Sequence, residues 1–129
     1  MKIILIEDNY DHAEMFRRYV RRLSPDIDIA HFEEGMEAFQ YVMAAPEEIR
    51  LLVVDLRLRM QNGVDLINNF REKTETRSIP IVVLTSSTQE RNSELSAKVD
   101  DYLIKPVNER MLKGLLDRFT PVLQRRRNL

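Results

Sequence analysis

The chain has 129 residues, of which 43% are apolar and 32% charged, and its 20 basic and 21 acidic side chains give a formal net charge of -1. This length and balance are typical of one globular domain and argue against binding to nucleic acid or membranes through a strong overall charge. The absence of cysteine excludes disulfides, cysteine-based zinc sites and thiol catalysis. The apolar runs are far too short to span a membrane, and the first residues, MKIILIEDN, are typical of a strand rather than a signal peptide, so we expect a cytoplasmic protein.

Strand and helix patterns alternate along the chain. A strand predicted at 2–6 (KIILI) is followed by a helix, a strand at 27–32 (IDIAHF), a second helix and a strand at 51–55 (LLVVD). A third helix, a strand at 79–85 (IPIVVLT), a weak helical segment, a strand at 101–105 (DYLIK) and a last helix complete the pattern. The apolar faces of the four clear helices are formed by Phe16, Tyr19, Val20 and Leu23, by Ala38, Phe39, Val42 and Met43, by Gly63, Leu66, Ile67 and Phe70, and by Leu112, Leu115, Leu116 and Phe119.

This alternation predicts an α/β fold in which helices cover both faces of a parallel sheet. The helical segment at 88–98 is the weakest element, because Leu95 and Ala97 are its only apolar residues. We therefore expect it to be helical but loosely held.

The last ten residues break the pattern. Pro121 disfavours a continuing helix, and Arg125 to Arg127 form a short basic run. We expect one domain at 1–119 and a basic tail at 120–129, which is either solvated or a docking segment for an acidic surface of a partner or a second protomer.

Polar residues stand where four of the five predicted strands end. Glu7 and Asp8 follow the first strand, and Asp55, Thr85 and Lys105 end the third, fourth and fifth. The carboxyl ends of parallel strands meet at one rim, which is where open α/β sheets bind ligands. The sequence therefore predicts that three carboxylates, a hydroxyl and an ammonium group converge there.

Three carboxylates at one rim repel each other, by about 4 kcal/mol per pair at about 4 Å and an effective dielectric constant of about 20. A hard divalent cation offsets this repulsion, and Mg²⁺ suits carboxylates, waters and a phosphoryl oxygen. Asp55 can then act as a nucleophile towards phosphorus, while Lys105 neutralises phosphoryl charge and the Thr85 hydroxyl donates to a phosphoryl oxygen. Each residue also has a structural explanation, since Asp8 and Asn9 could cap a helix and the others could lie in loops. Their joint occurrence favours a phosphoryl site.

The segments ILIEDN, LLVVDLRLRMQNG, IVVLTSS and DYLIKP, in this order, resemble the signature segments of the receiver domain of two-component response regulators. The resemblance covers residues 1–119 and implies a CheY-like, flavodoxin-like fold, a doubly wound five-stranded parallel sheet in the order 2-1-3-4-5. It also implies a stand-alone response regulator in a phosphorelay, which accepts a phosphoryl group from a sensor histidine kinase or phosphotransfer protein and signals to a downstream protein by direct contact.

The resemblance implies that Asp55 is the phosphoacceptor and that the cofactor is Mg²⁺. Asp8 and Asp55 would bind the cation directly. Glu7 would act through water, and the backbone carbonyl of Arg57 would be a further ligand.

Thr85 and Lys105 would contact the phosphoryl group by the same resemblance. Tyr102 matches the aromatic switch position, whose ring turns inward as the Thr85 hydroxyl moves to the phosphoryl group. We expect the face built from the fourth helix, the fifth strand and the last helix to change most and to carry a partner or homodimer contact.

The chain departs from the family pattern outside these groups. Arg59 and Tyr10 stand where proline is usual, Lys98 and Val99 replace a small pair, and Ser86 follows the threonine. No catalytic group is lost, but the loop geometry and the lifetime of the phosphoryl group do not carry over from the family.

Two other functions stay open. An aspartyl-nucleophile phosphatase of the haloacid dehalogenase type usually has a second Asp two residues after the first, where this chain has Arg57. A degenerate receiver would be an interaction module that is never phosphorylated, although all the signature residues are present. We expect no enzyme beyond its own Mg²⁺-dependent phosphorylation and dephosphorylation. His12 and His31, isolated in the sequence, are expected to be a surface helix residue and a strand residue rather than ligands.

Overall fold

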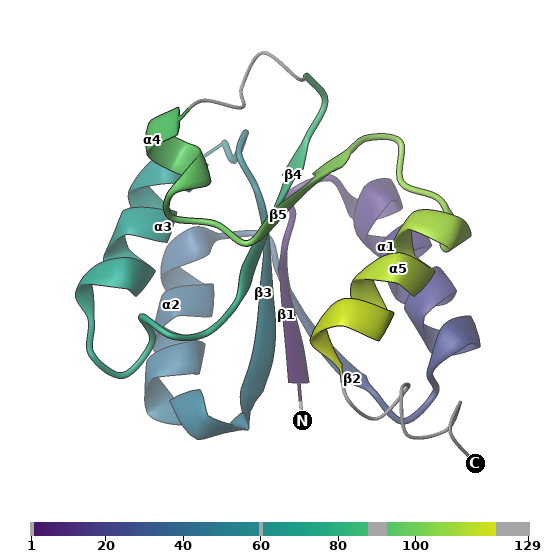
Figure 1. Cartoon of the computed structure of the whole chain (residues 1–129), viewed down its shortest axis with the longest axis horizontal. Helices are drawn as coiled ribbons and strands as arrows, with labels where there is room; N and C mark the ends of the chain where they lie inside the picture. Colours follow the sequence, from purple (N-terminus) through teal and green to yellow (C-terminus); the bar gives the residue numbers. More distant parts are fainter. Residues whose placement is uncertain (1, 60, 88–92, 121–129) are drawn as a thin grey trace.

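A computed structural model describes residues 2–59, 61–87 and 93–120. Its single sheet has five parallel strands in the order β2-β1-β3-β4-β5, with helices on both sides (Figure 1). The predicted doubly wound α/β fold and its strand order are therefore confirmed. The strands are β1 (Lys2–Ile6), β2 (Asp28–Phe32), β3 (Ile49–Asp55), β4 (Ile81–Thr85) and β5 (Asp101–Ile104).

Two apolar cores lie on the two faces of the sheet. The helices α1 (Tyr10–Leu23) and α5 (Glu109–Phe119) cover one face, while α2 (Gly35–Ala44), α3 (Gly63–Glu72) and the short α4 (Ser93–Ser96) lie on the other (Figure 1). A 3₁₀ turn (Pro46–Glu48) leads into β3. The central strands β1, β3 and β4 are buried along almost their whole length, which is why they are nearly continuous apolar runs in the sequence.

Two strand starts differ from the prediction. β3 begins at Ile49, two residues earlier than expected, because Ile49 is buried and pairs with Lys2 of β1. β4 begins at Ile81, two residues later, because Pro80 has no N–H to donate to the sheet, although its carbonyl accepts from the Leu52 N–H at 2.9 Å. β2 and β5 are each one residue shorter than predicted.

The predicted fourth helix is only partly observed. Within the described residues it is a single turn, α4, whose one buried residue is Leu95. Ala97 and Lys98 follow it outside the helix, and residues 88–92 lie outside the described part of the chain. With so little apolar surface, packing does not extend the helix past Ser96.

The last described residue, Thr120, belongs to the folded domain. Its side chain is buried, and its hydroxyl donates to the Leu116 carbonyl at 2.5 Å, which closes α5. The basic run at 125–127 lies outside the described residues. No helix in the described ranges is long and apolar enough to cross a membrane.

Gly63 permits a close backbone approach directly beside Asp55. Its N–H donates to the Leu56 carbonyl at 3.2 Å. A Cβ atom at this position would lie 2.7 Å from the Asp55 carbonyl oxygen and 2.7 Å from the Leu56 Cα atom. Both are backbone atoms, so a side chain here would displace the start of α3 or the end of β3.

We therefore expect Gly63→Ala to lower the free energy of unfolding by about 1–3 kcal/mol, measured by urea denaturation. Gly114→Ala is the matched control, because a Cβ atom in that part of α5 meets nothing within 4 Å. The control should raise stability by about 0.5–1 kcal/mol, since alanine restricts the unfolded chain more than glycine does. Equal effects of the two substitutions would contradict this account of Gly63.

Candidate functional site

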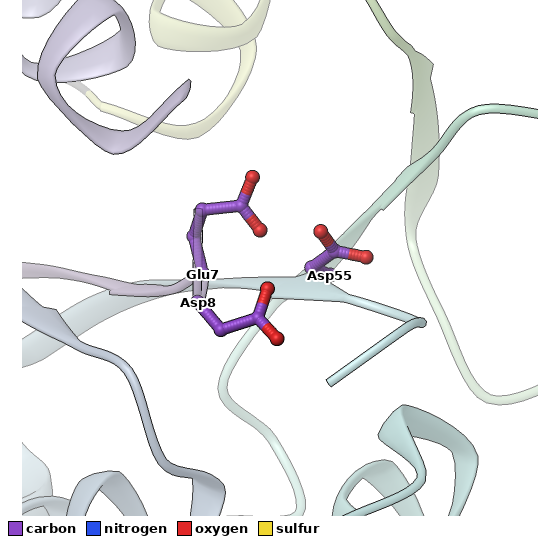
Figure 2. A group of neighbouring side chains, drawn as sticks. All are labelled: Glu7, Asp8 and Asp55. Carbon is purple, nitrogen blue, oxygen red and sulfur yellow. The ribbon is translucent and has the colours of Figure 1, made fainter. Parts of the chain in front are cut away.

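The two central strands bring the acids together. β1 and β3 pair in parallel with Ile6 opposite Val54, so that Glu7 and Asp55 leave the sheet side by side. Asp8 follows on the same loop, and oxygen atoms from all three carboxylates lie within 4.8 Å of one another. Figure 2 shows the three carboxyl groups gathered at the ends of these strands. Glu7 and Asp55 are only 1% and 5% exposed, so this is a buried cluster of like charges.

Helix capping leaves Asp8 available to the cluster. The N-cap of α1 is Asn9, whose side chain accepts from the His12 N–H at 3.0 Å. Asp8 Oδ2 instead accepts from the backbone N–H of Arg59 at 3.0 Å and lies 3.7 Å from Arg59 Nε. A proline at position 59 could not make this backbone contact, because proline has no N–H. The departure from the family pattern thus adds a cationic side chain beside Asp8.

Lys105 joins the two most buried carboxylates. Its backbone N–H donates to the Thr85 carbonyl at 2.7 Å, which fixes the end of β5 against β4. Its ammonium group reaches across the rim and donates to Glu7 Oε1 at 2.5 Å and to Asp55 Oδ2 at 2.6 Å. One ammonium group therefore serves two buried carboxylates, and the cluster with Asp8 keeps a surplus of negative charge when all its groups are ionised.

The proton affinities in this cluster differ from their ordinary values. Burial, followed by the contact with Asp55, raises the pKa of Glu7 to about 8, against the opposing effect of Lys105. Burial also acts to raise the pKa of Asp55, but hydrogen bonds with Glu7, Lys105 and the Arg57 N–H outweigh it and hold that pKa below its usual range. Burial acts to lower the pKa of Lys105, but its contacts with Asp55 and Glu7 outweigh this and raise it. In the absence of a divalent cation a proton is therefore held more readily at Glu7 than at Asp55.

The donor set fits a hard divalent cation. Among the described residues, Glu7 Oε2 is buried and has no hydrogen-bond partner, which is costly for a carboxylate oxygen. A water molecule bound to a cation would supply the missing donor, and the other acids offer the oxygen ligands that Mg²⁺ prefers. Arg57 lies on the loop that follows β3, where its N–H donates to Asp55 Oδ1 at 2.8 Å. Its carbonyl as a metal ligand stays a prediction.

Thr85 and Tyr102 lie on neighbouring strands beside the cluster. Thr85 ends β4 and is buried; its hydroxyl donates to the Ser87 carbonyl at 3.1 Å and accepts from the Ser87 N–H at 3.2 Å. Tyr102 packs against the core on the α2–α3 side, and its hydroxyl lies 3.1 Å from Ser96 Oγ in α4. The ring therefore connects β5 to the only turn of α4 that the structure describes.

His12 lies on the surface of a helix and His31 in a strand, as the sequence predicted, but their contacts with the site were not predicted. His12 lies in the first turn of α1, with Nδ1 at 3.1 Å from Glu7 Oε1 and 3.1 Å from Lys105 Nζ. His31 donates from Nε2 to the Glu7 carbonyl at 2.7 Å, and thereby supports the end of β1 from β2. One signal in the sequence was usable: a helix that starts just after Asp8 must place its first turn next to the strand ends.

This geometry defines a class of protein. The family model for the response regulator receiver domain matches residues 3–117, and the chain belongs to this family. Over 116 residues it is 34% identical to the sensor histidine kinase TmoS of Ectopseudomonas mendocina, which covers 88% of this chain but only 11% of that kinase. It is 26% identical to the chemotaxis protein CheY homolog of Campylobacter jejuni, over 91% of this chain and 90% of that protein.

Solved structures agree with the fold. The receiver domain of the sensor histidine kinase PA1611 from Pseudomonas aeruginosa, solved with a magnesium ion coordinated in its active-site cleft, matches with a TM-score of 0.77 and 26% identity, covering 92% of this chain and 95% of that one. The relatives thus include both single-domain regulators and parts of kinases. The chain is a two-component signalling domain of the CheY-like fold.

The raised pKa of Glu7 predicts a pH-dependent stability in the absence of divalent cations. A carboxyl group whose pKa is higher in the folded than in the unfolded protein favours folding while it is protonated, and this contribution is lost as the pH rises. The free energy of unfolding should therefore fall between about pH 4.5 and pH 8 in the wild-type protein. Glu7→Gln should weaken this fall, measured by urea denaturation in the presence of a chelator.

The depressed pKa of Asp55 acts at lower pH, and the raised pKa of Lys105 acts at higher pH, so neither dominates this window. Glu14→Gln, on the surface of α1, is the matched control and should leave the pH dependence unchanged. If Glu7→Gln and wild type lost stability in parallel, Glu7 would not be the titrating group.

Proposed function

We propose that the protein is a phosphorylation-activated response regulator that accepts a phosphoryl group on Asp55. The observation that carries this proposal is the contact of Lys105 with a buried, ionised Asp55, next to two further carboxylates. A carboxylate in this setting is a nucleophile with a cationic neighbour ready to balance phosphoryl charge. The phosphodonor is a phosphohistidine of a histidine kinase or of a phosphotransfer protein.

In the proposed reaction a carboxylate oxygen of Asp55 attacks the phosphorus atom. The new O–P bond forms as the P–N bond of the phosphohistidine breaks, and the electron pair of that bond returns to the imidazole nitrogen of the donor. Lys105 turns from Asp55 to a phosphoryl oxygen, and the Thr85 hydroxyl donates to another. This transfer consists mainly of positioning and charge neutralisation, which the cluster already provides.

Mg²⁺ is the proposed cofactor. Asp8 and Asp55 would bind it directly, Glu7 through water and Arg57 through its carbonyl. When bound, it would offset the repulsion among the carboxylates and neutralise charge on the phosphoryl oxygens. The unpartnered Glu7 Oε2 supports the water-mediated contact, and the ion pair between Arg59 and Asp8 must loosen as the cation binds.

The alternatives are less well supported. Arg57 stands where an aspartyl phosphatase needs its second acid. Its backbone N–H donates to Asp55, but its side chain has no carboxyl group that could protonate a leaving group. A degenerate receiver that is never phosphorylated agrees with the fold, but this alternative does not explain why Lys105 and the three acids converge. We propose a signalling module whose output is contact with another protein.

The switch would run through Thr85 and Tyr102. Movement of the Thr85 hydroxyl away from Ser87 towards the phosphoryl group would free space beside β5, and Tyr102 would then exchange its contact with Ser96 for an inward position. Leu95 is the single buried residue of α4, so little apolar contact opposes a shift of this turn. The face of α4, β5 and α5 is accordingly the proposed contact surface for a target or a second protomer.

Phosphorylation is tested by intact mass after incubation with Mg²⁺ and acetyl phosphate or a phosphoramidate. We expect one added phosphoryl group in the wild type, none in Asp55→Asn, and none when Mg²⁺ is chelated. Asp65→Asn, which removes an exposed acid in α3, is the matched control and should label like wild type. Unmodified wild type, or labelled Asp55→Asn, would refute the assignment.

The switch is tested by hydrogen exchange with and without beryllofluoride, a mimic of the phosphoryl group. We expect protection to change across residues 93–110 as well as near Asp55, because Thr85 and Tyr102 link these parts. The change should be absent in Asp55→Asn. A change confined to the neighbourhood of Asp55 would mean that the site is not coupled to α4 and β5.

A further inference from the structure

His12 completes the surroundings of the Lys105 ammonium group. A lysine ammonium group has three N–H donors. Two of them point to Glu7 Oε1 at 2.5 Å and Asp55 Oδ2 at 2.6 Å, and the third acceptor within reach is His12 Nδ1 at 3.1 Å. The three donors therefore meet three acceptors, which come from β1, β3 and α1.

Two positions of the ring proton are compatible with these distances, and they differ in how well they satisfy Lys105. His12 Nδ1 is equally close, at 3.1 Å, to Glu7 Oε1, so this nitrogen could donate to the carboxylate or accept from the ammonium group. If Nδ1 carried the hydrogen, it would donate to Glu7 Oε1, and the third N–H group of Lys105 would have no acceptor among these three side chains. If it is the acceptor, all three N–H groups of Lys105 are satisfied, and Glu7 Oε1 keeps its shorter contact with Lys105.

The setting strengthens this contact. His12 and Lys105 line a cavity of about 120 Å³ whose other walls are apolar, formed by Met15, Phe16, Leu84, Pro106 and Val107. Apolar walls on one side reduce the competition from water for the Lys105–His12 hydrogen bond. The His12 side chain is nevertheless half exposed, so it can be replaced without opening a hole in the core.

We propose that His12 is a positioning residue that holds the ammonium group of Lys105 for phosphoryl transfer to Asp55. The proposal rests on the proposed function of the site. During transfer, Lys105 must release Asp55 Oδ2 in order to reach a phosphoryl oxygen, and Glu7 becomes engaged with the hydrated cation. His12 Nδ1 is the acceptor that neither event removes, so it keeps the ammonium group at the rim while its other contacts exchange.

The test compares phosphorylation rates with a phosphoramidate and Mg²⁺ in three proteins. The nucleophile is an Asp55 oxygen, the bond that breaks is P–N, and the leaving nitrogen departs as the protonated amine of the donor. His12→Phe keeps a ring but has no acceptor, and it should slow phosphorylation about fivefold, the factor that corresponds to one ordinary hydrogen bond. His12→Asn places Oδ1 where Nδ1 was, one bond from Cγ, and should restore most of the rate.

Three further measurements separate positioning from a general structural effect. The affinity for Mg²⁺ should be the same in His12→Phe and in wild type, because His12 is not among the proposed ligands. Glu14→Gln, two residues further along α1, should phosphorylate at the wild-type rate, because it loses only a surface pair with Arg17. Nitrogen NMR of the His12 ring should show a proton on Nε2 and none on Nδ1. In Lys105→Met the proton should move from Nε2 to Nδ1, which then donates to Glu7.

The outcomes are distinct. If wild type takes up no phosphoryl group, the proposed function fails, and this inference fails with it. If wild type is phosphorylated and His12→Phe reacts equally fast, or His12→Asn is as slow as His12→Phe, the function stands and the role of His12 is refuted. A ring protonated at Nδ1 in the wild-type protein would refute it independently of any rate.

Discussion

One ammonium group between two buried carboxylates organises the functional end of this molecule. Lys105 follows β5 and donates to Glu7, just after β1, and to Asp55, at the end of β3, although β4 lies between β5 and both of these strands. Burying either acid alone would be costly, so their placement in the centre of the sheet depends on this shared cation. The contact also fixes the rim on which every proposed step takes place.

The same cluster lowers the stability of the folded protein. Three acids and one ammonium group leave excess negative charge in a poorly solvated place, and the unpartnered Glu7 Oε2 is a direct sign of that cost. The proposed cation and phosphoryl group would offset this cost when they bind, and would thereby stabilise the conformation that binds them. The neighbours His12 and Arg59 adjust this balance from the solvent side, the first beside the ammonium group and the second beside Asp8.

The loop that follows α4 is held against α3 by polar contacts. The guanidinium group of Arg71 in α3 donates to the carbonyls of Lys98, Arg77 and Ile79 at 2.7–2.8 Å, and Lys98 Nζ donates to the Asn68 side chain at 2.7 Å. The loop from α4 to β5 is therefore tied to α3. The face proposed to move thus has a firm attachment on one side and the single buried Leu95 on the other.

Much of this could be predicted from the sequence, because buried parallel strands are continuous apolar runs and their last residues are polar only where a site needs them. The order of strands, the two helical layers and the positions of Glu7, Asp8, Asp55, Thr85 and Lys105 follow from that pattern together with the family resemblance. The start of β4 was predicted two residues too early, because Pro80 continues the apolar run in the sequence but has no N–H to donate to the sheet.

Only the tertiary structure decided the contacts between side chains that are distant in the sequence. His12 is a surface residue of α1, as predicted, and the fold adds that its ring contacts Lys105, 93 positions further along the chain. Arg59 reaches Asp8 from another loop, and His31 supports Glu7 from β2. Sequence periodicity reports which face of an element is buried, whereas the direction of a polar side chain at the rim depends on how the loops and helices pack around it, which no local pattern encodes.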